Sequence, residues 1–294
     1  MITRVTSQTQ MRAAQRNLQE NMTQLAKLHE QAASLKAITR PSDDPTATAA
    51  SMKVRAELRA AVQYSRNVDN GNDWLTTIDS AMSAITDIMN RVRDLTVQGA
   101  NDGALSASAK EAIAVELETL RQDLFNQSNT TYLGRNVFAG NSDDGAAFNA
   151  DLRFNGTSGS TVERRIGPDS TVRVDADGEA IFGTESGSVF ALLDAIVGDL
   201  RIDTSISGHL AAIDDRMSVM IGQHSEIGAR HAQIQRAEET LMEQSGSLEA
   251  QRSGIEDVDL GQLILDLKLQ EVTYQSALAV TARVLQPTLM DFLK

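Results

Sequence analysis

The chain has 294 residues, a net charge of −13 and no cysteine. The acidic balance argues against a nucleic-acid ligand, which requires a basic surface. The lack of cysteine excludes disulfides and a thiol nucleophile, and no apolar run reaches the ~18 residues of a membrane span. Aromatic residues make up only 4% of the chain against 41% hydrophobic content, a mixture that favours long helices over a compact enzyme core.

Residues 1–38 predict an amphipathic helix, because their apolar side chains recur every three or four positions. The apolar positions are Met11, Leu18, Met22, Leu25, Leu28, Ala32 and Leu35. Pro41 disfavours helical backbone at Arg40, so we expect this helix to stop there. Asp44 and Pro45 match an N-cap followed by proline at the first helical position, which predicts the start of a second helix.

One long helical pattern extends over Pro45–Gly99, and the helix is interruptible near residues 70–72, where glycine lies between two asparagines. Ser108 and Glu111 match a capping box, which predicts a shorter helix to about Asn126.

The composition changes at Thr131, after which Gly, Asp, Ser and Thr are frequent. Alternating runs at 162–166 and 171–174, separated by turn residues 167–169, predict a small antiparallel β unit. Residues 188–202 predict a further short helix. This β-rich region therefore interrupts an otherwise helical chain.

The segment Ile213–Leu248 carries an unbroken heptad register, which places one stripe along a long helix that needs partner helices to cover it. The stripe consists of Ile213, Met217, Met220, His224, Ile227, His231, Ile234, Glu238, Leu241, Ser245 and Leu248. His224 and His231 are seven residues apart, too far for the one-turn spacing that chelates a metal. We interpret them as polar residues of a helix seam, which set register.

Residues 257–294 predict a final helix, preceded by a break flanked by Gly246 and Gly254 and kinked or ended at Pro287. Both ends of the chain thus offer an apolar stripe beyond the main bundle. The predicted fold is mainly α: an elongated bundle of long helices formed by the N- and C-terminal segments, with a small inserted β domain (α+β overall).

The sequence contains no phosphate-binding loop, no dinucleotide fingerprint and no HExxH or CxxC motif. Residues 175–178 (Asp-Ala-Asp-Gly) resemble the start of a calcium loop, but the later ligands, ending in a glutamate at position 12, are missing. A β-turn is the preferred interpretation of these four residues. No catalytic set, cofactor or metal site is predicted, so an enzyme is the weak hypothesis.

Three stretches resemble motifs of the bacterial flagellin superfamily. Residues 38–49 (ITRPSDDPTATA) are similar to the N-terminal signature, in the Pro-Ser-Asp-Asp-Pro form of the family's hook-filament junction members. Residues 129–140 resemble the run N-x-x-Y-L-G-R-Y-x-F-x-G, with Asn136 in place of the usual aromatic. Residues 270–282 resemble the family's closing helix. The resemblance covers residues 1–140 and 205–294 and leaves the β insert outside.

The resemblance implies three modules. Residues 1–44 plus 253–294 would form a terminal coiled-coil module for inner-tube assembly, 45–139 plus 206–252 a long-helix bundle, and 140–205 an outward-facing β-rich insert. The implied assembly interface consists of Ile2, Val5, Met11, Leu18, Met22, Leu25, Leu260, Ile264, Leu267, Leu278, Leu285 and Leu289. The implied interdomain joint consists of Pro41, Asp43, Asp44 and Pro45.

The resemblance also implies a function. The chain is expected to be a non-enzymatic axial protein of the flagellum that joins the hook, through the first hook-associated protein, to the flagellin filament. Its other implied partners are copies of itself in a lateral ring, the flagellar export apparatus and an export chaperone, without nucleic acid or membrane insertion. Targeting signals alone predict a cytoplasmic protein, because residues 1–4 lack the apolar start of a signal peptide. The resemblance replaces this with export through the flagellar type III system to the extracellular flagellum.

Two alternatives stay open at this point. A short filament flagellin would share most of these features, although its signature usually lacks the two prolines. A secreted coiled-coil translocator or signalling rod would share the heptads but not the Pro-Ser-Asp-Asp-Pro stretch.

Overall fold

The computed structural model describes residues 7–101 and 105–284. The chain forms two compact units. We call residues 1–60 with 245–294 the terminal unit, and residues 61–244 the core unit. Two long helices, α2 (Pro45–Gly99) and α6 (His209–Glu256), run without interruption through the boundary and contribute residues to both units.

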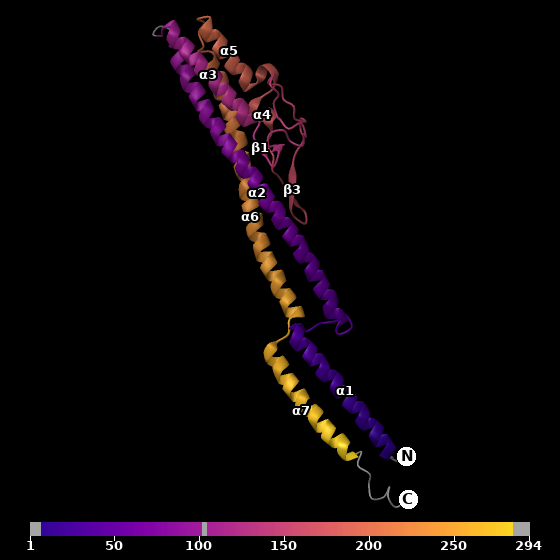
Figure 1. The fold of residues 1–294 in the computed structure, drawn as a ribbon. Helices are drawn as coiled ribbons and strands as arrows, with labels where there is room; N and C mark the ends of the chain where they lie inside the picture. Colours follow the sequence, from indigo (N-terminus) through magenta and orange to yellow (C-terminus); the bar gives the residue numbers. More distant parts are fainter. Residues whose placement is uncertain (1–6, 102–104, 285–294) are drawn as a thin grey trace, which may run out of the picture. The chain divides into compact units, whose positions relative to one another are not determined.

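The terminal unit is built on α1 (Ser7–Ser34) and α7 (Leu260–Val284), which lie side by side (Figure 1). Leu18 and Leu25 of α1 and Leu267 of α7 are half-buried, and Leu263 is 3% exposed. The side-chain amide of Gln270 donates to both the backbone oxygen and the side-chain oxygen of Asn21, at 3.1 and 3.2 Å. The chain ends therefore pair through a partly apolar, partly polar interface.

The core unit buries the seam that the heptads predict. Five apolar residues at seven-residue spacing on α6 are at most 6% exposed: Ile213, Met220, Ile227, Ile234 and Leu241. His224 and His231 lie in the same seam, where their Nε2 atoms are 2.8 Å from Asp79 Oδ1 and Asn72 Oδ1 of α2. The prediction that they are polar seam residues is confirmed.

Two helices of intermediate length also belong to the core unit. α3 (Ala107–Ser128) lies beside α5 (Val189–Arg201). The lone Trp74 of α2 is 2% exposed, as expected of a core residue.

The β region has two small antiparallel sheets. Strand β1 (Thr131–Tyr132) pairs with β2 (Arg135–Asn136), and β3 (Glu163–Gly167) pairs with β4 (Ser170–Arg173) in the register Arg164↔Val172. Short helices α4 (Gly178–Phe182) and η1 (Glu185–Gly187) follow. Six phenylalanines are in edge or stacked contact here, at centroid distances of 5.3–6.4 Å. They are Phe125, Phe138, Phe148, Phe154, Phe182 and Phe190.

Asp175 and Asp177 have structural roles. Asp175 is fully buried, and its carboxylate accepts from Val162 N at 2.7 Å and from the Arg173 guanidinium at 2.8 and 3.0 Å. Asp177 caps α4 by accepting from Ala180 N at 3.0 Å. Both carboxylates are thus committed to the fold. Asp177 and Gly178 begin α4, and residues 175–178 do not form the expected β-turn.

Several predicted helix boundaries are wrong. α1 ends at Ser34 because Leu35 takes a positive φ of 57°, several residues before Pro41. α3 is capped by Ser106, which accepts from Ala109 N, instead of by Ser108. α6 continues through Gly246 and Gly254 to Glu256, because the break lies at 257–259. Pro287 lies outside the described residues.

The single long helix predicted over Pro45–Gly99 is confirmed, and α2 is not interrupted near residues 70–72. A Cβ at Gly71 would lie 2.7 Å from Ile234 Cδ1 and 3.2 Å from Val174 Cγ1. The glycine therefore provides close helix packing within a continuous helix. None of the helices in the described residues combines the length and apolar character that crossing a membrane requires.

The predicted fold class is confirmed: long helices from both ends of the chain with a small inserted β region. The two compact units divide the chain at residues 60/61 and 244/245. The division into three modules stays a prediction.

Candidate functional site

The loop between α1 and α2 is fixed by two aspartates. Asp44 caps α2, because its Oδ1 accepts from the backbone amides of Thr46 and Ala47 at 3.0 and 2.9 Å. Asp43 folds back into the loop, where its Oδ2 accepts from Arg40 N at 2.9 Å and from Thr39 Oγ1 at 3.1 Å. The hydrogen bond from Arg40 lowers the pKa of Asp43, with further contributions from Thr39 and Lys27.

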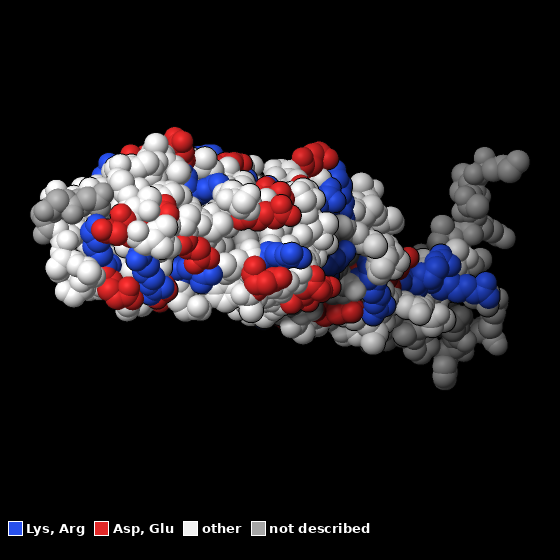
Figure 2. Space-filling view, turned by 90° about the horizontal axis from the view of Figure 1, so that it is seen from above, with Lys and Arg blue, Asp and Glu red and all other residues white. Residues whose placement is uncertain are grey.

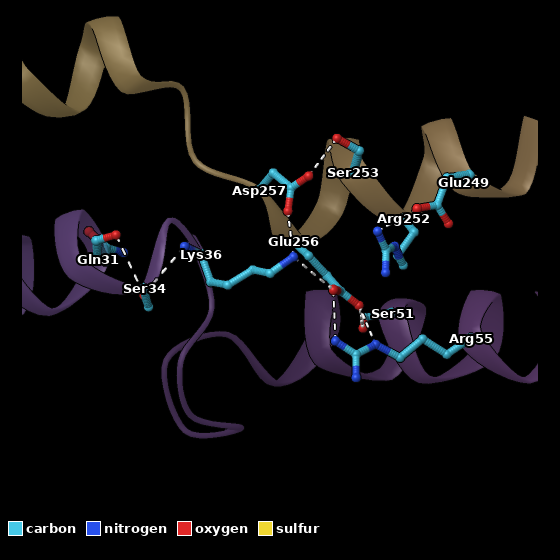
Figure 3. Close-up of polar contacts among 10 residues, drawn as sticks. All are labelled: Gln31, Ser34, Lys36, Ser51, Arg55, Glu249, Arg252, Ser253, Glu256 and Asp257. Carbon is cyan, nitrogen blue, oxygen red and sulfur yellow. Dashed lines mark hydrogen bonds and ion pairs between the residues drawn. The ribbon is translucent and has the colours of Figure 1, made fainter. Parts of the chain in front are cut away.

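The same loop is tied to the break between α6 and α7. Ala37 N donates to Glu256 O at 2.7 Å, and Val258 N donates to Leu35 O at 3.3 Å. The two segments thus form one antiparallel bridge between Lys36 and Asp257. Lys36 Nζ lies 2.5 Å from Asp257 Oδ1, and Ser253 Oγ donates to the second oxygen of Asp257 at 2.7 Å (Figure 3).

Glu256 is the centre of this arrangement. Its side chain is 4% exposed and accepts from Ser51 Oγ at 2.6 Å and from Arg55 Nη2 at 2.7 Å, with a second bond from Arg55 Nε. Figure 3 shows the Arg55 guanidinium facing both carboxylate oxygens. These bonds, with that of Arg55 the largest cause, lower the pKa of Glu256 from 4.5 to about 2. We call Lys36, Ser51, Arg55, Glu256 and Asp257 the joint clamp.

A cleft of about 280 Å³ lies beside the clamp in the terminal unit. It is lined by Lys36, Ile38, Thr39, Arg40, Pro41, Thr48, Ser51, Met52, Arg55 and Glu256. Its one carboxylate, that of Glu256, is bound by Arg55 and Ser51. Across the described residues, no cluster of three histidine, aspartate or glutamate side chains could hold a metal ion. What these residues do is hold the α1–α2 loop against the break between α6 and α7.

The predicted assembly residues separate into three groups. Leu18, Leu25 and Leu267 are half-buried between α1 and α7. Five others are exposed in the isolated chain: Met11, Met22, Leu260, Ile264 and Leu278. Ile2, Val5, Leu285 and Leu289 lie outside the described residues.

The exposed apolar surface of α7 is larger than predicted. Leu265 and Leu269 are 66% and 68% exposed, and Val272 and Val280 are 60% and 58% exposed. We call the exposed apolar residues of α7 the outer stripe; they are Leu260, Ile264, Leu265, Leu269, Val272, Leu278 and Val280. Large exposed apolar patches on proteins mark interaction sites, which makes the outer stripe the candidate surface for contact with other molecules.

Two family models match the chain. The bacterial flagellin N-terminal helical region matches residues 5–143, and the bacterial flagellin C-terminal helical region matches residues 210–293. The chain belongs to the bacterial flagellin family. It is therefore a structural component of the bacterial flagellum.

Individual relatives name different parts of the flagellum. The chain is 27% identical to the flagellar filament 33 kDa core protein of Treponema phagedenis over 282 residues, covering 94% of this chain and 93% of the relative. Its fold is similar to a putative flagellar hook-associated protein from Vibrio parahaemolyticus, with a TM-score of 0.68 and 22% identity over 73% of this chain and 100% of the other. It is also similar to the flagellar junction protein FlgL from Legionella pneumophila, with a TM-score of 0.58 and 14% identity over 70% and 100% of the two chains.

The joint clamp lies within the flagellin-family segments. Lys36, Ser51 and Arg55 belong to the N-terminal match, and Glu256 and Asp257 to the C-terminal match. Residues 144–209, which hold most of the β region, lie between the two matches. The clamp therefore connects the two family segments inside the terminal unit.

Sequence reasoning found the loop aspartates but missed the clamp. Asp44 and Pro45 carry a local capping signal, whereas Arg55 and Glu256 are 201 residues apart and look like ordinary surface residues of amphipathic helices. A weak signal was available at Glu256-Asp257, since two acids at the end of a long helix oppose the helix dipole and require cations nearby.

Charged side chains of both signs are interspersed over the face of the molecule seen in Figure 2. Ion pairs between α3 and α5 illustrate the pattern: Arg201 bonds both Glu111 and Glu118, and Arg121 bonds Asp194. Together with the net charge of −13, this mixed face is unlike the basic surfaces that bind nucleic acid.

Proposed function

We propose that this flagellin-family protein is the hook-filament junction protein of its flagellum, corresponding to hook-associated protein 3. It would join the hook, through the first hook-associated protein, to the flagellin filament. The Pro-Ser-Asp-Asp-Pro stretch and the fold shared with solved hook-associated and junction proteins support this role. It would act by assembly, without catalysis.

The observation that carries an assembly role is the outer stripe. Seven apolar side chains of α7 are between 42% and 68% exposed, although α1 packs along this helix in the terminal unit. Burying one such side chain is worth about 1.5–3 kcal/mol. The stripe is therefore strongly stabilised by neighbouring subunits that cover it.

Neighbouring copies are the first partners of this stripe. The exposed residues Met11, Met22, Leu260, Ile264 and Leu278, with Ile2, Val5, Leu285 and Leu289, would pack against adjacent subunits in a lateral ring around the inner tube. Leu18, Leu25 and Leu267 would hold α1 and α7 together as the element that is presented. Heterologous contacts of this kind leave a free edge above and below, where the first hook-associated protein and flagellin would bind.

The loop and clamp supply the rigid connection that such a subunit needs. Pro41, Asp43, Asp44 and Pro45 shape the turn into α2, and Glu256 fixes the break between α6 and α7 to that turn. A load on the paired ends would pass into α2 and α6 through this clamp.

Delivery is part of the proposal. The chain would leave the cell through the flagellar export apparatus, escorted by an export chaperone, and function outside the cell. The absence of cysteine suits a chain that is threaded unfolded and then folds outside, because no thiol can form wrong disulfides on the way.

A filament flagellin is the competing function. The near full-length match to the Treponema phagedenis filament core protein favours it directly. Immunogold labelling of isolated flagella with an antibody against residues 140–205 separates the two. A narrow band of gold where hook meets filament is expected; gold along the whole filament would assign the chain to the filament.

A second experiment tests the outer stripe. Leu278→Asp places a charge in the stripe and is expected to leave secretion intact while filaments detach from the hook. Ile221→Asp is the control, because Ile221 is a similarly exposed apolar residue of α6 in the core unit, at 52% against 42%. Normal filament attachment in the Leu278→Asp strain would refute the assembly role of the stripe.

A further inference from the structure

The tip of the β1–β2 hairpin combines two unfavourable features at one residue. Leu133 is 79% exposed, the most exposed of the large apolar side chains in the described residues. Its backbone has a positive φ of 49°, followed by Gly134 at 79°. Positive φ at both central positions is the pattern of a type I′ turn, which favours Asn-Gly.

An exposed leucine alone requires no explanation, because single apolar residues are common on protein surfaces. A leucine with left-handed backbone is different, since this conformation is unfavourable for residues with a Cβ other than asparagine and aspartate. Asn at position 133 would remove both disadvantages. Residues kept in unfavourable backbone geometry concentrate at functional positions. A contact with another molecule would explain why leucine occupies position 133.

A groove with a complementary lining lies elsewhere on the core unit. It has a volume of about 410 Å³ and runs between η1–α5 and the first turns of α6. Its apolar lining consists of Ala191, Leu192, Ala195, Ala212 and Val219. The small alanine side chains leave room for an incoming apolar side chain, and none of the β1–β2 residues lines the groove.

We propose that Leu133 of one copy inserts into the α5–α6 groove of a neighbouring copy. Charge complementarity favours a second copy as the occupant. Arg135, two residues from the tip, donates to Asn141 Oδ1 at 2.9 Å, and its paired carboxylate, on the 95% exposed Asp143, is 3.8 Å away. Asp215 is the exposed charge at the wall of the groove, because the neighbouring Arg216 is half-buried and donates to the carbonyl oxygens of Ala180 and Gly187. A docked hairpin would bring these opposite charges to the same rim.

The inserted side chain and the groove are different surfaces of the same unit, so each copy can dock on one neighbour and receive another. Contacts that are made in this head-to-tail way are heterologous and generate rings or open helical arrays. The inference rests on the proposed assembly into the flagellum and adds a second interface, on the core unit, to the one formed by the outer stripe.

The natural absence of cysteine allows a direct test. The double variant Leu133→Cys with Ala195→Cys is expected to form disulfide-linked oligomers in isolated flagella under mild oxidation, since docking would bring the two positions within disulfide reach. The control pair Leu133→Cys with Ala229→Cys places the second cysteine on the exposed surface of α6 outside the groove and is expected to stay monomeric. Failure of the first pair to cross-link, or equal cross-linking of both pairs, would overturn the contact.

Leu133→Asn separates a role in assembly from a role in folding. The purified variant is expected to melt at the same or a higher temperature than the natural chain, while self-association weakens by about tenfold or more through loss of one buried leucine. A lower melting temperature, or unchanged association in sedimentation velocity, would overturn the proposal. Gold labelling along the whole filament would remove the junction function and leave the cross-link as evidence for this contact within a filament.

Discussion

The core unit and the terminal unit differ in how far their apolar helix faces are buried. The buried hydrophobic cluster runs from Val68 to Leu241, entirely within the core unit. In the described part of the terminal unit, the buried apolar side chains are Val54, Leu248 and Leu263, which are 3–7% exposed. The core unit therefore buries its apolar helix faces against its own side chains, whereas the terminal unit is held by a polar clamp and leaves more of its apolar surface exposed.

The largest expected effect comes from opening the core unit. Leu117 of α3 is 0% exposed, and Leu117→Ala should lower the free energy of unfolding by about 2–5 kcal/mol, from lost burial and the cavity left behind. Trp74 is the single tryptophan and is 2% exposed, so its fluorescence in a denaturant titration reports on this unit alone.

The matched variant is Leu265→Ala in the outer stripe, where the side chain is 66% exposed. It should change the stability of the isolated chain by less than about 0.5 kcal/mol and should weaken assembly instead. If Leu265→Ala destabilised the monomer as much as Leu117→Ala, the contrast between the two units would be wrong.

A smaller effect is expected at the joint clamp. Glu256→Gln removes the carboxylate that binds Ser51 and Arg55. Because Arg55 is 53% exposed and can turn to water, we expect about 1–3 kcal/mol, less than for a fully buried ion pair. Faster hydrogen exchange at the amides of Ala37 and Val258, which bond across the clamp, would measure it.

Glu249→Gln is the control for this variant, since it breaks only a surface pair with Arg252 three residues away. Surface pairs contribute about 0–1 kcal/mol, so the exchange of Ala37 and Val258 should stay as in the natural chain. Equal exchange rates in the two variants would show that Glu256 stabilises the clamp no more than a surface ion pair does.

The clamp also predicts a response to acid. The pKa of Glu256 is lowered from 4.5 to about 2 in the folded chain, so its stabilisation is complete above about pH 5 and is lost as the pH falls toward 2. The protection of the Val258 amide, measured relative to the intrinsic exchange rate at each pH, should therefore decrease over this interval. Glu256→Gln should remove that decrease; an unchanged acid response would assign it to other groups such as Asp43 or Asp257, whose pKa values are also lowered.

The sequence predicts the core unit's seam well, because its heptad spacing is a local pattern that any long helix converts into one face. Ile213, Ile227 and Ile234 are buried as this spacing requires. Helix ends were predicted less accurately. The end of α1 depends on the positive φ of Leu35 and on the bridge to residues 256–258. This bridge joins positions more than 200 residues apart, and no local sequence pattern predicts such a contact.

The clamp illustrates the same limit within the candidate site. Asp44 was found because an N-cap is read from neighbouring residues. Glu256 was missed because its role depends on Ser51 and Arg55, which reach it only in the folded chain. The sequence predicted an exposed apolar stripe on α7 but underestimated its size. Leu265 and Leu269 fall outside a strict heptad, and their exposure is known only once the structure shows which face of α7 lies opposite α1.

The smallest effect concerns two glycines inside long helices of the core unit. Gly71→Ala should destabilise by about 1 kcal/mol, since overpacking against Ile234 and Val174 outweighs the gain in helix propensity. Gly228→Ala, where a Cβ meets nothing within 4 Å, should stabilise by about 0.5–1 kcal/mol. Opposite shifts in the Trp74 unfolding midpoint would show that close helix packing, and not chain flexibility, keeps glycine at position 71. Stabilisation by both variants would instead mean that the α2–α6 contact is loose, and that the core unit is less closed than its buried seam indicates.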